Sequence, residues 1–224
     1  ISQPYEFKLQ VTTPLGDIQS SDYIGQTISL QLYGANNTYR YLHGLIDEVT
    51  HCTDMITHDN KYIFILRPDL YKLQSLYDCQ MYSDMSAPDI ITQLLNRLDT
   101  SHFDFSRLRN SYPPLTKQMR YNESGLIFLH RLLKNAEITY YFLHTDTHSN
   151  LIFIDQNDTF EHSSQPLTLK FNHDIHDDIV TLQTIKHTSP SQIQALDYNY
   201  QQPSESVTAT QSLTLNTSLS LAKP

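Results

Sequence analysis

The chain has 224 residues, enough for one large domain or two small ones, each able to bury a core without disulfides. Its 24 Asp and Glu residues outnumber its 15 Lys and Arg residues, which gives a net charge of -9 near neutrality. Because a chain with this charge repels a phosphate backbone, we expect no nucleic-acid partner.

Neither the apolar runs nor the cysteines indicate a membrane span or a zinc site. No run approaches the roughly 20 apolar residues that cross a bilayer, so we expect a soluble protein made in the cytoplasm. Cys52 and Cys79 lie far apart without metal-binding spacing, and we expect them to be reduced thiols in the core. The sequence begins at Ile1 and ends in a Ser/Thr/Leu-rich tail, so we expect it to be part of a longer protein.

The first 70 residues predict four strands. Tyr5 to Val11 and Ile28 to Leu32 alternate apolar and polar residues with a period of two, as strands with one buried face do. Two further strands are predicted at Tyr41 to Val49 and at Tyr62 to Leu66. Within the third strand, Gly44 indicates a bulge or a close approach of two backbones. Four strands in about 65 residues indicate an antiparallel barrel or sandwich.

The periodicity becomes helical between Asp69 and Asn110. Ser86 begins a Ser-Ala-Pro-Asp sequence that resembles a capping box, and Pro88 falls in the first turn, where its missing N–H costs little. Ser111 to Thr116 is predicted to be an extended link. The apolar stripe of the helix consists of Ile90, Ile91, Leu94, Leu95 and Leu98.

The segment from Met119 to Phe142 predicts a second helix followed within two residues by a strand. We expect Asn122 to cap the first turn and Glu123 to interact favourably with the positive end of the helix. The helix is expected to end through a left-handed Asn135 or through tertiary contacts. Its apolar stripe consists of Leu126, Leu129, Leu132, Leu133 and Ala136.

The remainder of the chain predicts further strands. Ile138 to Leu143 is crowded with β-branched and aromatic residues, as in a strand buried on both faces or at a subunit contact. It is expected to form a hairpin with Leu151 to Ile154. After Pro203 the composition indicates an exposed strand or a frayed end. A second small β unit is predicted from strands at Leu167 to Phe171, Ile179 to Ile185 and Leu196 to Tyr200.

Histidines and carboxylates at short spacing offer two metal-site hypotheses. His144, Asp146 and His148 form one set, and His173 and His176 with neighbouring aspartates form the other. Both sets lie in predicted loops, where sequence spacing does not fix the geometry as it does on a helix. We therefore interpret them as solvated histidines and expect no metal site and no cofactor.

No catalytic residue is predicted. The adjacent carboxylates Asp47 and Glu48 are expected to point to opposite faces of a strand, which is a poor arrangement for a general acid and base. The sequence lacks GxSxG, HExxH, a glycine-rich phosphate loop and a thiol-protease signature.

Tyrosine dominates the aromatic residues, with 15 Tyr against nine Phe and no Trp. Such residues can build a stacking groove for sugars, but their ordinary roles are strand packing and protein interfaces. Many lie on predicted strands: Tyr5, Tyr41, Tyr62, Tyr140, Tyr141, Tyr198 and Tyr200.

Seven sequence blocks between Pro4 and Ser204 carry a family resemblance. In order they are PYEFKLQV, DYIGQTISLQL, RYLHGLIDEV, YIFILRPDLYKLQ, APDIITQLL, MRYNESGLIFLHRLLKNAEITYYF and ALDYNYQQPS. Their joint order and spacing resemble the VgrG spike proteins of type VI secretion. The region matched is the N-terminal part, which in that family is similar to the baseplate hub protein of contractile-tailed bacteriophages.

The resemblance implies a mainly β fold with a helical insertion (α+β), in which two small antiparallel β-barrels are joined by a helix-containing mixed region. The expected boundaries are 1–70 for the first barrel, 71–160 for the connecting region and 161–224 for the second barrel, which is expected to be incomplete if the chain ends at Pro224. It also implies a homotrimer whose six barrels form a pseudo-six-fold ring. A tube of haemolysin-coregulated protein rings can then dock on that ring.

The function implied is a structural hub of a cell-puncturing spike and not an enzyme. Further expected partners are baseplate components and an effector, with synthesis in the bacterial cytoplasm and delivery out of the cell or into target cells. We expect Tyr140 and Tyr141 to contribute to the surface between subunits. Two alternatives stay open: a phage or prophage tail hub, and an envelope glycan-binding or effector module.

Overall fold

A computed structural model of the chain divides it into two compact units, Ile1–Pro166 and Leu167–Pro224, which are described separately. The fold class is mainly β with a helical insertion, as predicted, and the described residues contain two α-helices. The structure describes residues 2–13, 19–33, 39–53, 60–98, 102–156, 160, 190–198, 200, 202–204 and 206–212.

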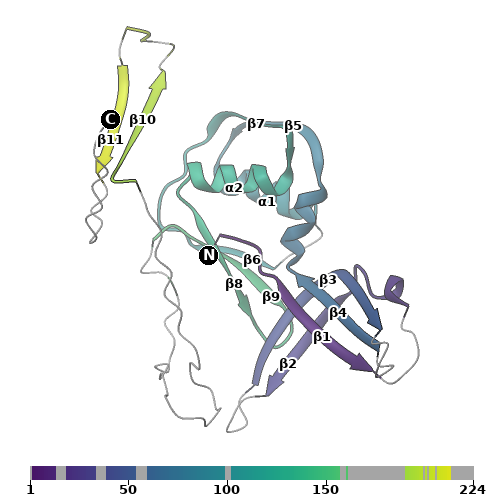
Figure 1. The fold of residues 1–224 in the computed structure, drawn as a ribbon. Helices are drawn as coiled ribbons and strands as arrows, with labels where there is room; N and C mark the ends of the chain where they lie inside the picture. The colour runs from purple at the N-terminus through teal and green to yellow at the C-terminus, as the bar shows by residue number, and fades with distance from the viewer. Residues whose placement is uncertain are drawn as a thin grey trace. The chain divides into compact units, whose positions relative to one another are not determined.

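The first unit begins with a curled four-stranded antiparallel sheet (Figure 1). A short 3-10 helix, η1 (Ser20–Asp22), precedes the second strand. The strand order is β1-β4-β3-β2, so that β1 and β2 are the edges of this sheet. All four predicted strands are confirmed, and the third extends beyond its predicted ends. Their bounds are β1 (Phe7–Thr13), β2 (Thr27–Tyr33), β3 (Tyr39–Thr53) and β4 (Asn60–Arg67).

Gly44 marks a close approach between β3 and β4, as predicted. A Cβ atom at this position would lie 2.9 Å from the Cβ of Leu66, closer than real side chains allow. The irregularity of β3 lies two residues later, where the pairing shifts between Ile46 and Glu48 and leaves Asp47 as the extra residue. Asp47 is paired with Arg67 at 3.0 Å, so it has a structural partner.

The rest of the first unit is a mixed region of strands and helices (Figure 1). β5 and β7 form a two-stranded antiparallel ribbon, and β6, β9 and β8 form a three-stranded sheet in that order. Within the latter, β6 runs parallel to β9, and β8 and β9 form the predicted hairpin. The bounds are η3 (Asp69–Ser75), β5 (Tyr77–Met85), α1 (Ala87–Asn96), β6 (Phe103–Arg107), β7 (Leu115–Ser124), α2 (Gly125–Asn135), β8 (Thr139–His144) and β9 (Ser149–Ile154).

The helix α1 is confirmed together with its capping box. The Ser86 side chain accepts a hydrogen bond from the Asp89 backbone N–H, and the Asp89 carboxylate accepts one from the Ser86 N–H. The helical prediction for the flanking residues is wrong, because this stretch also contains the strands β5 and β6. Each of these strands gains its backbone hydrogen bonds from a partner distant in sequence, which local periodicity does not reveal.

The start of α2 differs from the prediction. Ser124, not Asn122, is the N-cap, and its hydroxyl accepts a hydrogen bond from the Ile127 N–H at 3.3 Å. Asn122 instead lies in β7 with a φ of 50°, beside the irregular pairing of β7 with β5. Asparagine tolerates this left-handed conformation better than most residues, which suits it to a bulge.

The end of α2 does not use a left-handed Asn135, which was one of the two predicted ways of ending the helix. Asn135 is the last residue of the helix, and the left-handed residue is Glu137, with a φ of 57°. The Ile138 N–H then donates to the Leu133 carbonyl at 2.9 Å, which satisfies an otherwise open carbonyl of the last turn. The helix therefore passes into β8 through a closed turn.

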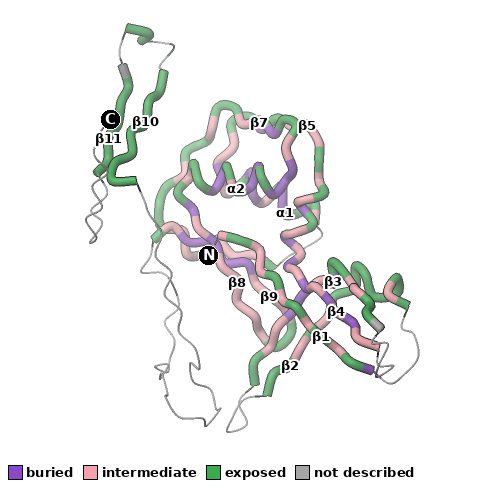
Figure 2. The backbone as a smooth tube through the Cα atoms, viewed as in Figure 1, coloured by how far each residue is buried: buried purple, intermediate pink, exposed green. Residues whose placement is uncertain are grey.

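Two apolar cores lie in the first unit (Figure 2). The larger one is built by α1, α2, β8 and β9 and includes both predicted helix stripes, with Leu94, Leu129 and Phe153 fully buried. The smaller one lies on the four-stranded sheet, and its buried members are Ile46, Tyr62, Phe64 and Leu66.

The second unit contains an antiparallel pair, β10 (Gln192–Tyr198) and β11 (Ser206–Ser212). These strands confirm the predicted strand around Leu196 and the exposed strand after Pro203. The strands predicted at Leu167 to Phe171 and at Ile179 to Ile185 lie outside the described residues.

The structure tests the predictions about membrane-spanning segments and about the two cysteines. Among the residues that the structure describes, no helix is long and apolar enough to cross a bilayer. Cys52 and Cys79 are free thiols as expected, but both are exposed, so their predicted place in the core is wrong.

Candidate functional site

A joint of polar and aromatic side chains connects the four-stranded sheet to the mixed region. The His43 backbone N–H in β3 donates to Nδ1 of His144 in β8 at 3.2 Å. The His43 ring lies between two partners, with Nδ1 2.8 Å from the Ser29 hydroxyl and Nε2 2.8 Å from the Thr145 carbonyl oxygen. Because a carbonyl oxygen can only accept, the proton of a neutral His43 ring is on Nε2. The joint therefore fixes the tautomer of His43.

Tyr5 completes this joint from the N-terminal segment. Its hydroxyl donates to the His43 carbonyl oxygen at 2.6 Å, and its ring stacks on Phe7 with centroids 4.7 Å apart. The ring also meets Phe142 edge-on at 4.8 Å. Burial raises the pKa of Tyr5 to about 12, so the hydroxyl stays a donor at neutral pH.

His144 is kept neutral in this joint. Burial lowers the pKa of His144 to about 4, and the positive charges of His43 and Arg40 act in the same direction. A neutral ring leaves Nδ1 free to accept the hydrogen bond from β3. At neutral pH the joint therefore includes an uncharged His144 ring and an uncharged Tyr5 hydroxyl.

A cavity of about 230 Å³ opens beside the joint. Tyr5, His43, His102, His148 and Asp69 are among its lining residues. The His102 and His148 rings stack on each other with centroids 4.0 Å apart. In the described part of the chain, no three His, Cys, Asp or Glu side chains are grouped so that they could hold a metal ion.

The structure separates the histidines of the first metal hypothesis. His144 faces His43 and Tyr5, whereas His148 stacks on His102 and its Nδ1 is 2.8 Å from the Thr147 hydroxyl. Within the described ranges, His144, Asp146 and His148 are thus not grouped to hold a metal ion, and the interpretation of His144 as a solvated loop residue is wrong, because His144 is half-buried at the end of β8. The second set, around His173 and His176, lies outside the described residues.

The two tyrosines predicted at the subunit interface occupy different environments. Tyr140 is fully buried in the larger core, and its hydroxyl is 2.9 Å from Nε2 of His130. Tyr141 is half-buried, and its hydroxyl accepts a hydrogen bond from Arg107 at 2.7 Å. Their role at an interface stays a prediction, and only Tyr141 can be replaced without opening the core.

The tyrosines do not gather into one stacking groove. Tyr62 and Tyr140 are both fully buried, in different cores. These two rings are therefore closed to a ligand in the folded chain. They have the packing role that is ordinary for tyrosine on strands.

An exposed apolar face that the sequence analysis missed lies on the outside of the β5–β7 ribbon. Tyr77 and Met81 on β5 are about 60% exposed, and Met119 and Tyr121 on β7 are exposed to a similar extent. The available signal was the period-two pattern in both segments, in which Tyr82 and Arg120 alternate with these residues. Figure 2 shows the exposed stretches of both strands.

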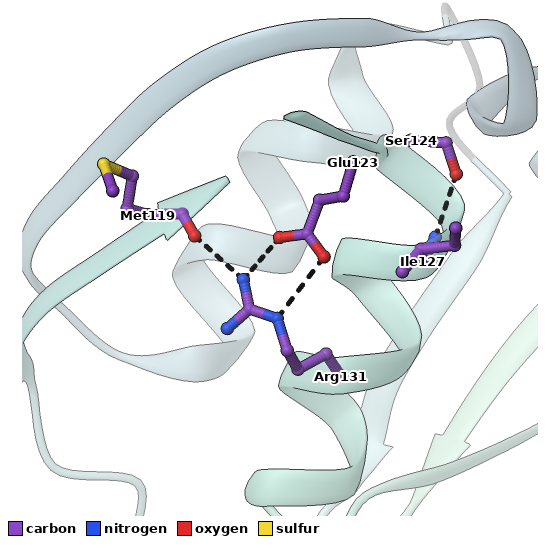
Figure 3. A network of polar contacts seen from close by, with 5 residues as sticks. All are labelled: Met119, Glu123, Ser124, Ile127 and Arg131. Carbon is purple, nitrogen blue, oxygen red and sulfur yellow. Dashed lines mark hydrogen bonds and ion pairs between the residues drawn. The ribbon is translucent and has the colours of Figure 1, made fainter. Parts of the chain in front are cut away.

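The junction of β7 with α2 is held by a compact polar network (Figure 3). Arg131 of α2 donates to the Glu123 carboxylate at 2.5 Å and to the Met119 carbonyl oxygen at 2.8 Å. Beside it, Ser124 caps the helix. These contacts fix the end of β7 on the first turns of α2.

Comparison with known proteins adds a family match over almost the whole chain. Residues 1–220 match the profile of the family described as the phage tail baseplate hub (GPD). Among curated proteins, the type VI secretion system spike protein VgrG1b of Pseudomonas aeruginosa is 27% identical over 69% of this chain. VgrG1a of the same organism is 23% identical over 89% of this chain.

The chain spans only 21% of the length of VgrG1b and 31% of the length of VgrG1a. Among solved structures, the Escherichia coli c3393 protein superposes with a TM-score of 0.66 at 21% identity. That alignment covers 89% of this chain and 50% of the E. coli chain. The E. coli protein is described as a component of the type VI secretion system with structural similarity to the T4 bacteriophage tail proteins gp27 and gp5.

Proposed function

The chain belongs to the phage tail baseplate hub family, and from this membership we propose that it is the structural hub of a trimeric cell-puncturing spike. The spike would stand at the tip of a contractile type VI secretion apparatus. The observation that carries the proposal is the family match over residues 1–220, together with the fold shared with a secretion-system component.

The domain division belongs to this proposal. Residues 1–70 form the first barrel, 71–160 the connecting region and 161–224 the second barrel. The curled sheet of β1 to β4 supports the first barrel, and the exposed pair of β10 and β11 supports a barrel that is completed by other strands. A two-stranded pair is only marginally stable in water by itself.

The proposed task is symmetry matching and a rigid connection. Three copies with two barrels each present six similar units to a six-fold tube of haemolysin-coregulated protein rings. The joint of His43, His144 and Tyr5 supports this task, because it links the sheet to the mixed region with partly buried hydrogen bonds. Force applied to the sheet then reaches the mixed region directly.

Further partners in the proposal are baseplate components and an effector. A solved Francisella structure, described as a PdpA-VgrG complex, aligns with 68% of this chain at a TM-score of 0.53 and 10% identity. Synthesis in the bacterial cytoplasm is followed by assembly at the apparatus and delivery out of the cell or into target cells.

The proposed role is mechanical and not enzymatic. One relative is named as an actin cross-linking toxin, VgrG1 of Vibrio cholerae, and is 22% identical over 90% of this chain. This chain covers only 18% of that toxin, so the name of the toxin is no evidence for the same activity in this chain. A phage or prophage tail hub is the second candidate, favoured by the family description itself.

Light scattering over a concentration series tests the proposal. We expect the mass of a trimer, because a hub that matches three-fold to six-fold symmetry needs three copies. Binding of the trimer to rings of haemolysin-coregulated protein, measured by co-sedimentation, distinguishes the secretion hub from a phage hub. A chain that stays a monomer at every concentration contradicts the proposal.

A further inference from the structure

The β5–β7 ribbon has two faces of opposite character. Its inner face holds Tyr82, which is 3% exposed and stacks on Phe128 of α2, and Arg120, which is fully buried. Strand geometry places alternate residues on opposite faces. Tyr77, Met81, Met119 and Tyr121 therefore point outward, and their exposed fractions of 62%, 60%, 52% and 67% agree with this placement.

The outward residues form one continuous patch, which we call the ribbon face. Met81 is paired directly with Met119 in the ladder, so their side chains are neighbours at its centre. Tyr77 and Tyr121 lie toward the same end of the ribbon, and the exposed thiol of Cys79 lies between Tyr77 and Met81 in the sequence. Tyrosine and methionine are enriched at protein interfaces, where they supply large contact areas.

The carboxylates next to the ribbon face form ion pairs with arginines of the same chain. Asp78 points inward and forms ion pairs with Arg120 and, at 2.6 Å, with Arg97. Glu123 is held by Arg131. The outward residues of the ribbon are Tyr77, Cys79, Met81, Ser83, Lys117, Met119 and Tyr121. The ribbon face therefore carries one positive charge, on Lys117, and no carboxylate.

This charge pattern favours a second copy of the chain as the partner of the ribbon face. The chain has a net charge of -9, so two copies repel each other wherever acidic surfaces meet. Charges separated by more than about 8 Å are largely screened in physiological salt. Whether two copies attract or repel each other therefore depends on the charges within the contact itself. An apolar face that carries a lysine and no carboxylate complements the acidic surface of a neighbouring copy, which in a three-fold ring contacts it with a different part of its own surface.

The edge of β7 is less suited to binding than the ribbon face. Figure 3 shows Arg131 reaching the Met119 carbonyl oxygen, which a strand added at this edge would need as an acceptor. The same arginine is fixed by Glu123. A partner would therefore pack on the side chains of the ribbon face and would not extend the sheet beyond β7.

We propose that the ribbon face is the surface through which one copy of this chain contacts the next copy in the trimer. The inference rests on the proposed function and adds to it the residues that carry the contact. Met81 and Met119 lie at its centre, and the rigid attachment of the ribbon to α2 keeps the surface pre-formed. Pre-formed surfaces lose less conformational entropy on binding.

The test is the solution mass of the full chain and two variants. The double variant Met81→Glu/Met119→Glu places two charges at the centre of the ribbon face, and we expect the mass to fall about threefold, to a monomer. Ile127→Glu is the matched control, because Ile127 is 51% exposed on α2, outside the ribbon face and outside the sheet of the proposed barrel ring, and it should leave the trimer intact. All three positions are exposed, so circular dichroism should show the same fold.

The native thiols provide a second measurement. Cys79 lies on the ribbon and Cys52 on the four-stranded sheet, and both are exposed in the single chain. In the trimer, a maleimide should label Cys79 several-fold more slowly than it labels Cys79 of the monomeric Met81→Glu/Met119→Glu variant. Equal rates for Cys79 in the two proteins would mean that the ribbon face stays open in the trimer, which overturns the assignment.

The outcomes separate this inference from the proposed function. A trimeric wild type with a trimeric double variant overturns the assignment to the ribbon face and leaves the hub proposal in place. Loss of the trimer in both variants also overturns the assignment, because assembly then responds to added charge anywhere. A monomeric wild type overturns the hub proposal and this inference together.

Discussion

The four-stranded sheet and the mixed region differ in how much apolar surface each buries within the chain. The mixed region encloses α1 and α2 in a large core, where Leu94, Leu95 and Leu129 are completely buried. The sheet buries few residues, and most of β2 is exposed or half-exposed. Burial of apolar area is the main favourable term in folding. The mixed region can thus stabilise itself, whereas the sheet gains stability from its joint with that region and, in the proposed trimer, from other subunits.

The same substitution in the two regions tests this contrast most strongly. Leu129→Ala removes a fully buried side chain from the larger core and should lower the free energy of unfolding by about 2–5 kcal/mol. Leu30→Ala on β2, where the leucine is half-buried, should cost about 1 kcal/mol. Urea unfolding at neutral pH measures both. Equal losses would contradict the contrast between the two regions.

The next largest loss of stability is expected where β3 packs closely against β4. Gly44→Ala would place a Cβ 2.9 Å from that of Leu66, so the strands must separate, and we expect a loss of about 1–3 kcal/mol. Thr50→Ala on the same strand is the control and should cost at most about 1 kcal/mol, because Thr50 is half-buried and its hydroxyl donates only to the exposed Glu48 carboxylate. Thermal unfolding compares the two. A neutral Gly44→Ala variant would mean that the sheet is less closely packed than the structure indicates.

The joint between the regions should respond to acid. His144 has a pKa of about 4 in the folded chain and 6.5 as its ordinary value, so between these values the unfolded chain binds a proton that the folded chain does not. The contribution of His144 to stability is complete above pH 6.5 and is lost as the pH falls toward 4. The slope contributed by this group is at most about 1.4 kcal/mol per pH unit.

The variant His144→Asn isolates this effect. An asparagine can still accept the hydrogen bond from the His43 N–H through its side-chain oxygen, but it does not titrate. Urea unfolding at several pH values within the window should show a flatter dependence in the variant than in the wild type. Identical slopes would exclude His144 as the acid-sensitive group of the joint.

How much the sequence could predict depends on where the hydrogen bonds of each element lie. Helix α1 could be predicted from sequence, because its capping residues Ser86 and Asp89 and its apolar stripe lie within one short segment. The hairpin of β8 and β9 was readable for the same reason. The ribbon was not, because β5 pairs with a strand that follows α1 and β6 in the sequence. The ribbon face was missed with it.

In the candidate site, too, contacts between segments distant in sequence could not be predicted. The sequence offered His144 and His148 as neighbours, since only three residues lie between them, but the fold places one against His43 and the other against His102. Nothing in the spacing of His43 and His144, which are 101 residues apart, indicated that they meet. A contact of this kind follows only from the packing of β3 on β8.

The strands of the first sheet and the two apolar helix stripes could be predicted from sequence, because each depends on residues near one another in the chain. The family resemblance, and the fold class with it, came from the order of seven blocks between Pro4 and Ser204. The fold was needed to place Asn122 in a bulge and to begin a helix at Gly125 against Leu73 and Arg120. It alone brought Tyr77 and Tyr121 onto one exposed face. The physical reason is that burial and cross-strand pairing are properties of segments far apart in sequence, and the free energy of such contacts overrides local preference.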